Sequence, residues 1–378
     1  MSNAAHSWVP LEGLQHQVAV EVLLRGPLSR KQLAARLGVT RGTVTRAAYP
    51  LIAAGLLVER PHVRAQGLGR PEEPLDVELT RDFFIGIKIT ADHLHGVVTT
   101  LRADVLHEAT VPLTSLSPQD VADRVADMVA ELSVRVPLVR AIGVSLGAQV
   151  LEGNLVTEAP LLGWAGVDLG SLLRARLSVP VVVDNDVLSL VRAERWFGAA
   201  GNSDNFALIT IGAGIGYGLV ANGTLIEGPD AGLNTITHFP LDLGGSVCSE
   251  GHTGCAETLL TIHAIRGRAL PTLGDVSFEE VLRLVPENTA AAAIVETAAF
   301  ALGKLIAAVA NLALPGKVVV TGDGVALALV GQNALQRGID LHRSRRATPL
   351  DLEVQVVGLS EWARGAAATA IETFVVGR

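Results

Sequence analysis

Residues 83–100, FFIGIKITADHLHGVVTT, decide the fold class of this chain. The stretch holds two short apolar runs, FFIGIKI and LHGVVTT, separated by a polar turn, which is typical of consecutive β-strands. AIGVSLG (141–147) and VPVVVDNDV (179–187) have the same character, and the amphipathic segment PQDVADRVADMVAEL (118–132) is typical of a helix. Short buried strands that alternate with helices predict an α/β fold.

The second half of the chain shows the same alternation. FALITIGAGIGYGLVANG (206–223) predicts two strands around a glycine-rich turn, and KVVVTGDGV (317–325) predicts a further strand after a helical region at 258–313. The glycines of the turn either present backbone N–H groups to a phosphate or form a tight hairpin. The alanine-rich helix SEWARGAAATAIETF (360–374) is expected to pack back on the first α/β set.

One strand of the first set ends in three polar residues, Asp184, Asn185 and Asp186. Open α/β sheets place their ligands beyond the carboxyl ends of parallel strands. We therefore expect this strand end to line a ligand-binding site.

The N-terminal end of the chain has the pattern of a helix-turn-helix. Apolar residues recur at helical spacing in 14–25, and Gly26-Pro27 ends that helix. Ser29 is suited to begin a second helix that ends at Gly38, and Thr40 is suited to begin a third. Helix, short glycine turn and helix together predict the DNA-binding motif.

A strand at 56–60 and the glycine-rich, arginine-bearing loop that follows it at 61–79 predict a wing beside these helices. The N-terminal half of the third helix is the part that reaches base edges in the major groove, and arginines of a wing enter a minor groove. The predicted DNA-binding residues are Lys31, Arg41, Thr43, Thr45, Arg46, Arg64 and Arg70.

The charge distribution supports nucleic-acid binding by this end. The net charge is −8, but residues 1–80 hold nine basic against seven acidic residues, whereas the remainder holds 21 against 31. Residues 25–70 contain all nine of those basic residues and one acid, Glu59. Such a segment attracts polyanions, which the acidic remainder repels. A helical interaction module with a solvated basic face is the alternative interpretation.

Composition indicates a globular protein from a reducing compartment. The chain has 378 residues, of which 49% are hydrophobic, enough for two or three domains. We expect no bilayer-spanning apolar run, no membrane partner and no secretory signal in MSNAAHSWVPLEG (1–13). Two cysteines cannot form a disulfide framework. These features predict a cytoplasmic protein.

Both cysteines of the chain lie in HFPLDLGGSVCSEGHTGCAE (238–257), behind a histidine. Thiolates and imidazoles are the ligands that zinc prefers, and short loop spacings let them converge on one ion. His238, Cys248 and Cys255 therefore predict a metal-binding loop. The alternative is that the cysteines are two ordinary small buried residues.

The chain resembles the ROK family, which groups bacterial sugar repressors with sugar kinases. The resemblance extends from Leu14 onward and rests on landmarks in the family's order. These landmarks are GRP (69–71), NGTLIEG (222–228), the histidine followed by the cysteine motif, and VVVTGDGV (318–325). The family's repressors carry an N-terminal winged helix that its kinases lack, so the chain resembles the repressor form.

The resemblance implies a two-lobed fold of the actin-like, ribonuclease-H-like sugar kinase type with an N-terminal winged helix-turn-helix domain. We expect the winged helix at 1–80 and the first α/β lobe at 81–194 with 358–378. The second lobe, with the metal loop, is expected at 195–357.

The resemblance also implies a structural zinc ion held by one histidine and three cysteines. His238, Cys248 and Cys255 match this set, but Glu250 stands where the middle cysteine belongs. Glutamate binds zinc through oxygen, so the expected ligands are His238, Cys248, Glu250 and Cys255. His252 is the alternative fourth ligand.

Four sugar-binding positions carry over from the family: Asn185, Asp186, His238 and Glu257. Two others do not, because Thr235 stands in place of a glutamate and Leu161 in place of an asparagine. These losses imply that the effector is a different or modified molecule, or that sugar sensing has been lost.

The resemblance argues against catalysis. Family kinases use a DxGGT motif for magnesium and phosphate, and this chain has Lys88-Ile89-Thr90-Ala91-Asp92 in its place. A lysine replaces the acid and both glycines are absent, so we expect neither kinase activity nor bound ATP or magnesium. Asp186, which matches the catalytic base, is retained.

We therefore hypothesise a repressor that binds operator DNA as a homodimer or homotetramer and releases it when a sugar binds between its lobes. The first alternative is an ATP-dependent sugar kinase with a fused DNA-binding domain. The second is a DNA-binding protein that needs no effector.

Overall fold

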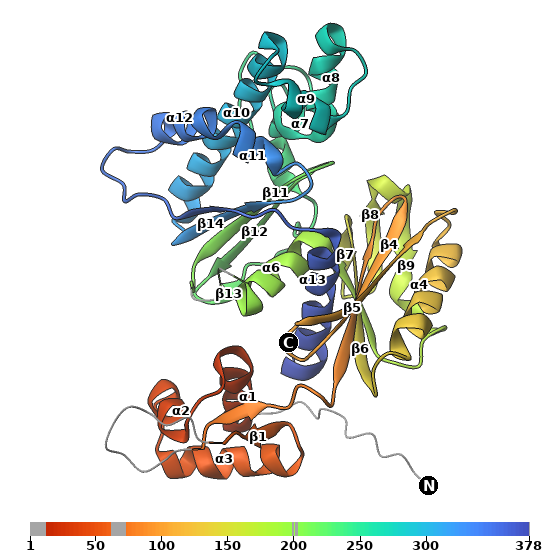
Figure 1. The fold of residues 1–378 in the computed structure, drawn as a ribbon, viewed down its shortest axis with the longest axis vertical. Helices are drawn as coiled ribbons and strands as arrows, with labels where there is room; N and C mark the ends of the chain where they lie inside the picture. The colour runs from red at the N-terminus through yellow and green to blue at the C-terminus, as the bar shows by residue number, and fades with distance from the viewer. Residues whose placement is uncertain (1–12, 62–72, 199, 201–202, 378) are drawn as a thin grey trace. The chain divides into compact units, whose positions relative to one another are not determined.

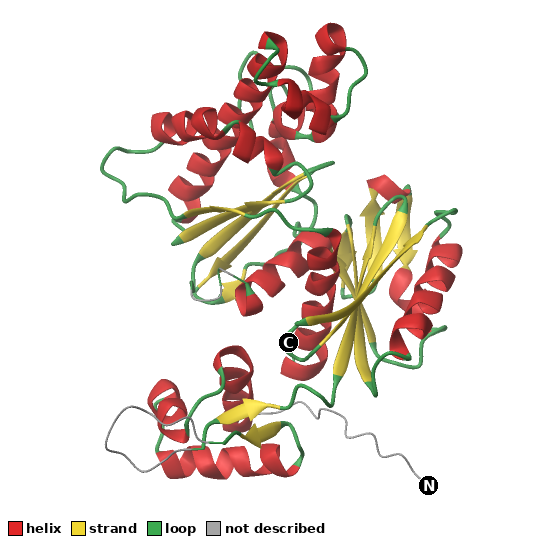
Figure 2. Ribbon diagram, in the orientation of Figure 1, coloured by secondary structure: helices red, strands yellow, loops and turns green. Residues whose placement is uncertain are grey.

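The computed structural model divides into two compact units, residues 1–189 with 362–378 and residues 190–361. Figure 1 follows the chain by colour and Figure 2 distinguishes its helices from its strands. The residues described are 13–61, 73–198, 200 and 203–377.

Three helices and a two-stranded sheet begin the first unit. They are α1 (Gly13–Arg25), α2 (Arg30–Leu37), α3 (Arg41–Ala53), β1 (Leu57–Glu59) and β2 (Leu75–Val77). The two strands pair antiparallel. This arrangement confirms the helices and the first strand predicted from the sequence. The loop between the strands lies largely at 62–72, outside the described residues, and so do Arg64 and Arg70.

A five-stranded sheet forms the centre of the first unit, in the order β10-β6-β3-β4-β5. Strand β3 runs parallel to β6, which runs parallel to β10, whereas β4 and β5 are antiparallel additions. The sheet thus confirms the strands expected in 83–147 and 179–187. Its members are β3 (Phe83–Ile89), β4 (His93–Thr99), β5 (Val105–Pro112), β6 (Val139–Leu146) and β10 (Val181–Asn185).

Helices cover both faces of this sheet. Helix α4 (Pro118–Ser133) packs on one face, where a Cβ added to Gly96 would meet Met128. Helix α13 (Leu359–Ile371) packs on the other face, as expected for the alanine-rich helix. It comes so close that a Cβ at Gly86 would lie 1.9 Å from the Ala363 carbonyl oxygen. Glycine is therefore required where this helix crosses the sheet.

Smaller elements complete the first unit. They are the sheet of β7 (Gln149–Leu151), β8 (Leu155–Ala159) and β9 (Trp164–Asp168), the short helices η1 (Pro160–Leu162) and α5 (Leu169–Arg174), and the π-helical turn η3 (Glu372–Val376). Helix α6 (Asp186–Phe197) begins directly after β10 and continues into the second unit.

The second unit has its own five-stranded sheet, in the order β13-β12-β11-β14-β15. Strands β11 and β12 pair antiparallel, so the glycine-rich turn between them forms a hairpin. Strand β14 runs parallel to β11. The members are β11 (Phe206–Ile211), β12 (Ile215–Ala221), β13 (Thr224–Leu225), β14 (Lys317–Thr321) and β15 (Leu352–Val354).

The helices of the second unit surround one long apolar helix, α10 (Thr289–Ala313). Its 25 residues, with mean hydropathy 1.8 over the most apolar window, correct the expectation that no apolar run is long enough to span a bilayer. In this structure 56% of that window is buried against its own unit, as in a core helix. The others are η2 (Thr235–His238), α7 (Ala256–Leu260), α8 (Ile262–Leu273), α9 (Phe278–Leu284), α11 (Ala326–Val330) and α12 (Gln332–His342).

Candidate functional site

The helix-turn-helix is fixed by local hydrogen bonds. The Ser29 hydroxyl accepts a hydrogen bond from the Gln32 backbone N–H at 3.2 Å, and the Gln32 side chain accepts one from the Ser29 N–H at 2.8 Å. This reciprocal pair begins α2. Gly38 ends it with φ +66°, and the Thr40 hydroxyl begins α3 by accepting from the Thr43 N–H at 3.2 Å. The sequence alone thus sets the start and end of the turn.

Helix α3 has a buried face and an exposed face. Val44, Ala47, Ala48 and Leu51 are buried against the rest of the motif. The predicted base-contacting positions lie on the other face: Arg41, Thr45 and Arg46 are exposed and Thr43 is half-buried.

Several arginines of residues 25–70 are paired with acids of the same unit, whereas other basic residues are not. Four of the nine basic residues form ion pairs with acids, namely Arg25 and Arg36 with Glu21, Arg30 with Glu59 and Arg60 with Asp76. Lys31 and Arg46 are exposed and have no acidic partner among the described residues. An unpaired cation on an exposed helix face is available to a phosphate.

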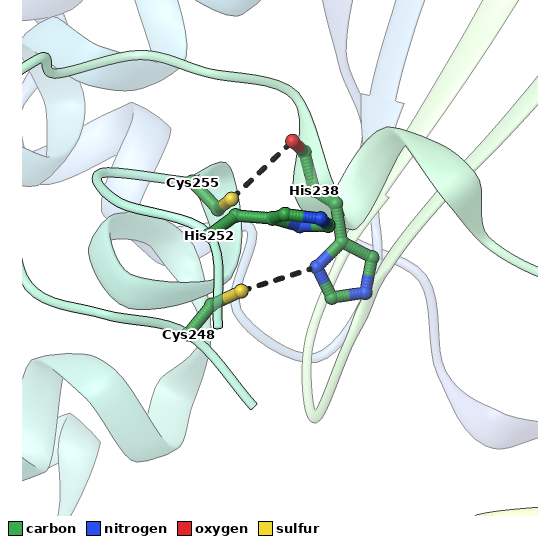
Figure 3. A group of neighbouring side chains, drawn as sticks. All are labelled: His238, Cys248, His252 and Cys255. Carbon is green, nitrogen blue, oxygen red and sulfur yellow. Dashed lines mark hydrogen bonds between the residues drawn. The ribbon is translucent and has the colours of Figure 1, made fainter. Parts of the chain in front are cut away.

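Four side chains of the second unit bring their ligand atoms together, as Figure 3 shows. The ligand atoms of His238, Cys248, His252 and Cys255 all lie within 4.8 Å of one another. His238 is the last residue of η2, Cys255 precedes α7, and the other two come from the loop between them. We refer to these four residues as the His/Cys cluster.

The loop that carries the cluster folds by short-range bonds. The Cys248 N–H donates to the His252 carbonyl at 2.8 Å, and the chain reverses at Gly251, where φ is +84°. Gly254 has φ +67°, and a Cβ there would lie 1.5 Å from the Asp242 carbonyl oxygen. Only glycine fits such a position. The reversal brings His252 back beside Cys248.

The thiols of the cluster lie close to His238. The Cys248 Sγ is 3.5 Å from the His238 Nδ1, and the Cys255 Sγ is 3.3 Å from the His238 carbonyl oxygen. Burial raises the pKa of the Cys255 thiol to about 11, and Cys248 and nearby acids add to the shift. A divalent cation held among these groups would reverse that effect, since it stabilises the thiolate.

The fourth member of the cluster differs from the sequence-based expectation, which was Glu250. The Glu250 side chain is 61% exposed, and its Oε1 lies 3.2 Å from the His238 Nε2, away from the Nδ1 that faces the Cys248 thiol. Glu250 precedes the chain reversal at Gly251, whereas His252 follows it. The chain reversal at Gly251 therefore places His252, the alternative fourth ligand, in the cluster.

Glu257 lies beside the cluster in the same unit. Its Oε2 is 3.6 Å from the His238 Nδ1 and accepts a hydrogen bond from the Ser249 hydroxyl at 3.0 Å. Two of the predicted effector-binding residues, His238 and Glu257, are thus neighbours. The other two, Asn185 and Asp186, belong to the first unit.

Asn185 ends strand β10 and begins helix α6. Its amide nitrogen donates to the Ala148 carbonyl at 2.8 Å, and its Oδ1 accepts from the N–H groups of Val187 and Leu188. The residue is 1% exposed. These bonds show that Asn185 holds the strand end and the helix start in place.

Asp186 forms a buried ion pair with Lys88. The two side chains are 12% and 10% exposed, and the Asp186 Oδ1 accepts from the Val187 N–H at 2.8 Å. The Lys88 ammonium also lies 5.2 Å from the centre of the Trp362 ring, at the start of α13. The Lys88 ammonium therefore lies against the carboxylate of Asp186, the residue that matches the catalytic base of the family's kinases. Sequence reasoning identified Lys88 as a substitution but missed this pairing and Trp362, because 98 residues separate Lys88 from Asp186.

The chain is a two-unit α/β protein with a helix-turn-helix at its N-terminal end and a His/Cys loop in its second unit. Such a chain combines the two-lobed sugar kinase fold with a DNA-binding module. The ROK family model matches residues 84–373, and the chain belongs to the ROK family.

Its curated relatives include repressors. The chain is 26% identical to the xylose repressor of Bacillus spizizenii over 272 residues, which cover 71% of each chain. It is 27% identical to the DNA-binding transcriptional dual regulator NagC of Escherichia coli over 315 residues, which cover 79% of this chain and 77% of the relative.

The solved structures of a ROK regulator and of a ROK sugar kinase differ in the share of this chain that they match. A ROK transcriptional regulator described as a homologue of the E. coli Mlc protein superimposes with a TM-score of 0.81 at 23% identity, covering 96% of this chain and 97% of its own. A ROK glucokinase from Streptomyces griseus gives a TM-score of 0.66 at 21% identity and covers 99% of its own length but 76% of this chain. The chain therefore has the architecture of the regulator.

Proposed function

We propose that this chain is a transcriptional regulator, a repressor of genes of carbohydrate metabolism, that binds operator DNA through α3. The observation that carries the proposal is the helix-turn-helix whose exposed face holds Arg46 without an acidic partner among the described residues. The named repressors for xylose and N-acetylglucosamine support it, as does the full-length regulator architecture.

The DNA-binding proposal is tested on duplexes selected from a random-sequence pool by the full-length protein. Arg46→Ala should weaken binding about 10- to 100-fold, the loss expected for one base-contacting arginine. Arg36→Ala is the matched control, because that arginine is paired with Glu21 on the same motif. Equal affinities for the two variants and the wild type would contradict a groove-binding role of α3.

We infer that the ligand of the regulator is a carbohydrate held by Asp186 and Glu257, with Asn185 and His238 in support. Carboxylates accept hydrogen bonds from adjacent sugar hydroxyls, which suits this ligand class. A thermal-shift titration with xylose, N-acetylglucosamine and glucose tests the inference. One of these sugars should raise the melting temperature of the wild type but not of Glu257→Gln. Absence of any shift across such a panel favours a regulator that needs no effector.

We infer that the His/Cys cluster holds a structural zinc ion through His238, Cys248, His252 and Cys255. Two sulfur and two nitrogen ligands are a common tetrahedral zinc set. Elemental analysis should find about one zinc per chain, and none in Cys255→Ser. His263→Ala is the matched control, because this exposed histidine of the same unit lies outside the cluster.

We infer that the chain does not transfer phosphoryl groups. The Lys88 ammonium is paired with the carboxylate that would act as base, and phosphoryl transfer depends on metal and phosphate positioning. Incubation with ATP, magnesium and hexoses should yield no ADP above the background of Asp186→Asn. Sugar-dependent ADP formation that Asp186→Asn abolishes would favour the sugar kinase alternative, since the fold is shared with glucokinases.

We further infer a cytoplasmic homodimer or homotetramer. A pair of helix-turn-helix modules matches two half-sites on one face of DNA. Light scattering of the purified protein and of its operator complex tests the stoichiometry.

A further inference from the structure

Arg102 connects the helix-turn-helix to the first sheet. It lies in the turn between β4 and β5, and its guanidinium donates to the Leu23 carbonyl at 3.0 Å and the Val22 carbonyl at 2.9 Å. The last carbonyls of a helix carry its negative dipole end, which a guanidinium stabilises. The same group donates to the Asp76 Oδ1 at 2.6 Å. One side chain therefore holds both the end of α1 and strand β2.

The C-terminal segment makes a second connection to α1. The His16 Nε2 lies 2.6 Å from the Val376 carbonyl oxygen, in the turn η3 that follows α13. Apolar side chains of α1, the β1–β2 sheet and the C-terminal turn meet beside this bond. The pocket between them is lined by His16 and Leu23 of α1, Leu57 and Val77 of the sheet, and Val376.

The two elements that contact α1, the β4–β5 turn and the C-terminal segment, belong to structures that also contact the Lys88–Asp186 pair. Strand β4, which ends at the Arg102 turn, places His95 directly opposite Lys88. Helix α13, which continues into η3, holds Trp362 of its first turn against the Lys88 ammonium. Two elements thus have one end at this buried pair and the other end at α1.

Helix α13 and the sheet are packed without space to slide locally. A Cβ added to Gly143 would lie 1.8 Å from the Ala366 carbonyl oxygen, and one added to Gly86 would lie 2.6 Å from the Ala367 nitrogen. Tightly packed elements transmit a shift as rigid bodies because interiors do not deform continuously. A displacement at Trp362 is therefore carried along the helix to Val376.

Ser145 is a second potential acceptor beside Lys88 on the sheet. Ser145 lies directly opposite Lys88 in the β3–β6 register, and its buried hydroxyl has no hydrogen-bond partner among the described residues. Neighbouring strands of a sheet lie about 4.8 Å apart, so the Lys88 and Ser145 side chains leave the sheet side by side on the same face. Lys88 can therefore exchange Asp186 for Ser145 when a ligand hydroxyl takes the Asp186 carboxylate. Such an exchange would give Lys88 two discrete states, one paired with Asp186 and one with Ser145.

We propose that ligand occupancy at Asp186 is communicated to helix α1 through the Lys88 exchange, and that Arg102 is the positioning residue that couples the two. The proposal rests on the proposed function, since it concerns the regulation of DNA binding by that same ligand site. In one state Trp362 and β4 hold α1 through Val376 and Arg102. In the other, release of Lys88 from Asp186 shifts these elements and loosens the end of α1.

The test uses amide hydrogen exchange of the full-length protein, without ligand or DNA. Asp186→Asn mimics release of Lys88 while keeping the bond to the Val187 N–H. Exchange of residues 22–25 should become about fivefold faster, the lower range of typical coupling between sites. In the Arg102→Met background, Asp186→Asn should produce no further change. Exchange of the β6 amides, measured in the same samples, shows that Asp186→Asn keeps the folded sheet, so that faster exchange of residues 22–25 is local.

Arg140→Met is the matched control. Arg140 is a similarly buried arginine of the same unit and pairs with Asp82 at 2.7 Å. Asp186→Asn should still accelerate exchange of residues 22–25 in that background. The proposal is overturned if Asp186→Asn leaves this exchange unchanged, or if Arg140→Met removes the effect as fully as Arg102→Met does. The DNA affinity of Arg46→Ala does not depend on this coupling, so failure of the coupling and failure of DNA binding remain distinguishable.

Discussion

The two candidate ligand centres of this chain are assembled in opposite ways. The His/Cys cluster is built from one loop of 238–255, whose short-range bonds and glycine turns bring four side chains together. The Lys88–Asp186 pair joins residues 98 positions apart, and Trp362 comes from the far end of the chain. A local centre depends on backbone conformation, whereas a long-range centre depends on burial and sheet register. Mutations should therefore damage the two centres for different reasons.

The largest effect is expected for Lys88→Met, which leaves the Asp186 carboxylate buried without its partner. Removal of one member of a buried ion pair costs about 3–5 kcal/mol of unfolding free energy. Urea denaturation of the variant and the wild type measures this loss of unfolding free energy. Adding Asp186→Asn should recover part of the loss, because the uncompensated charge is then gone.

Arg135→Met supplies the comparison for that prediction. Arg135, two residues beyond the end of α4, pairs with Glu131 of that helix, and both side chains are at least 41% exposed. An exposed pair contributes at most about 1 kcal/mol. Equal destabilisation by Lys88→Met and Arg135→Met would show that the buried pair has no special role in the unit's stability.

An intermediate effect is expected for Gly254→Ala in the loop of the His/Cys cluster. Its Cβ would overlap the Asp242 carbonyl oxygen, so the backbone must move, at a cost of about 1–3 kcal/mol. Because the backbone movement displaces the neighbouring Cys255, the zinc content of Gly254→Ala should also fall. Gly251→Ala is the control, because that glycine also has positive φ but has open space around its Cβ position. Equal zinc loss in both variants would indicate that φ strain alone controls the loop.

The smallest effect is expected for Glu250→Gln. Its exposed carboxylate lies at the His238 Nε2, whereas the Cys248 thiol lies at the Nδ1, so zinc content should stay near one per chain and stability should change by less than about 0.5 kcal/mol. His252→Ala should remove the metal. Zinc loss in Glu250→Gln with retention in His252→Ala would restore the ligand set expected from the sequence.

Sequence reasoning succeeded where structure depends on neighbouring residues. Ser29, Gly38 and Thr40 mark the helix ends because caps and left-handed turns are local preferences. The strands around 83–100 followed from apolar runs bounded by turn residues. The expectation that no apolar run reaches the length of a bilayer span was wrong for α10, because a helix buried in a protein core can be as long and as apolar as a membrane span.

The sequence by itself determined the element order, the helix-turn-helix and the convergence of His238, Cys248 and Cys255, because each follows from spacing along the chain. Only the tertiary structure decided that His252 rather than Glu250 completes the cluster, since that choice depends on which side of a chain reversal each residue lies. It also decided that Lys88 pairs with Asp186 against Trp362 and that Arg102 holds α1. Such contacts depend on strand register and helix packing, which bring distant residues together and leave no local pattern in the sequence.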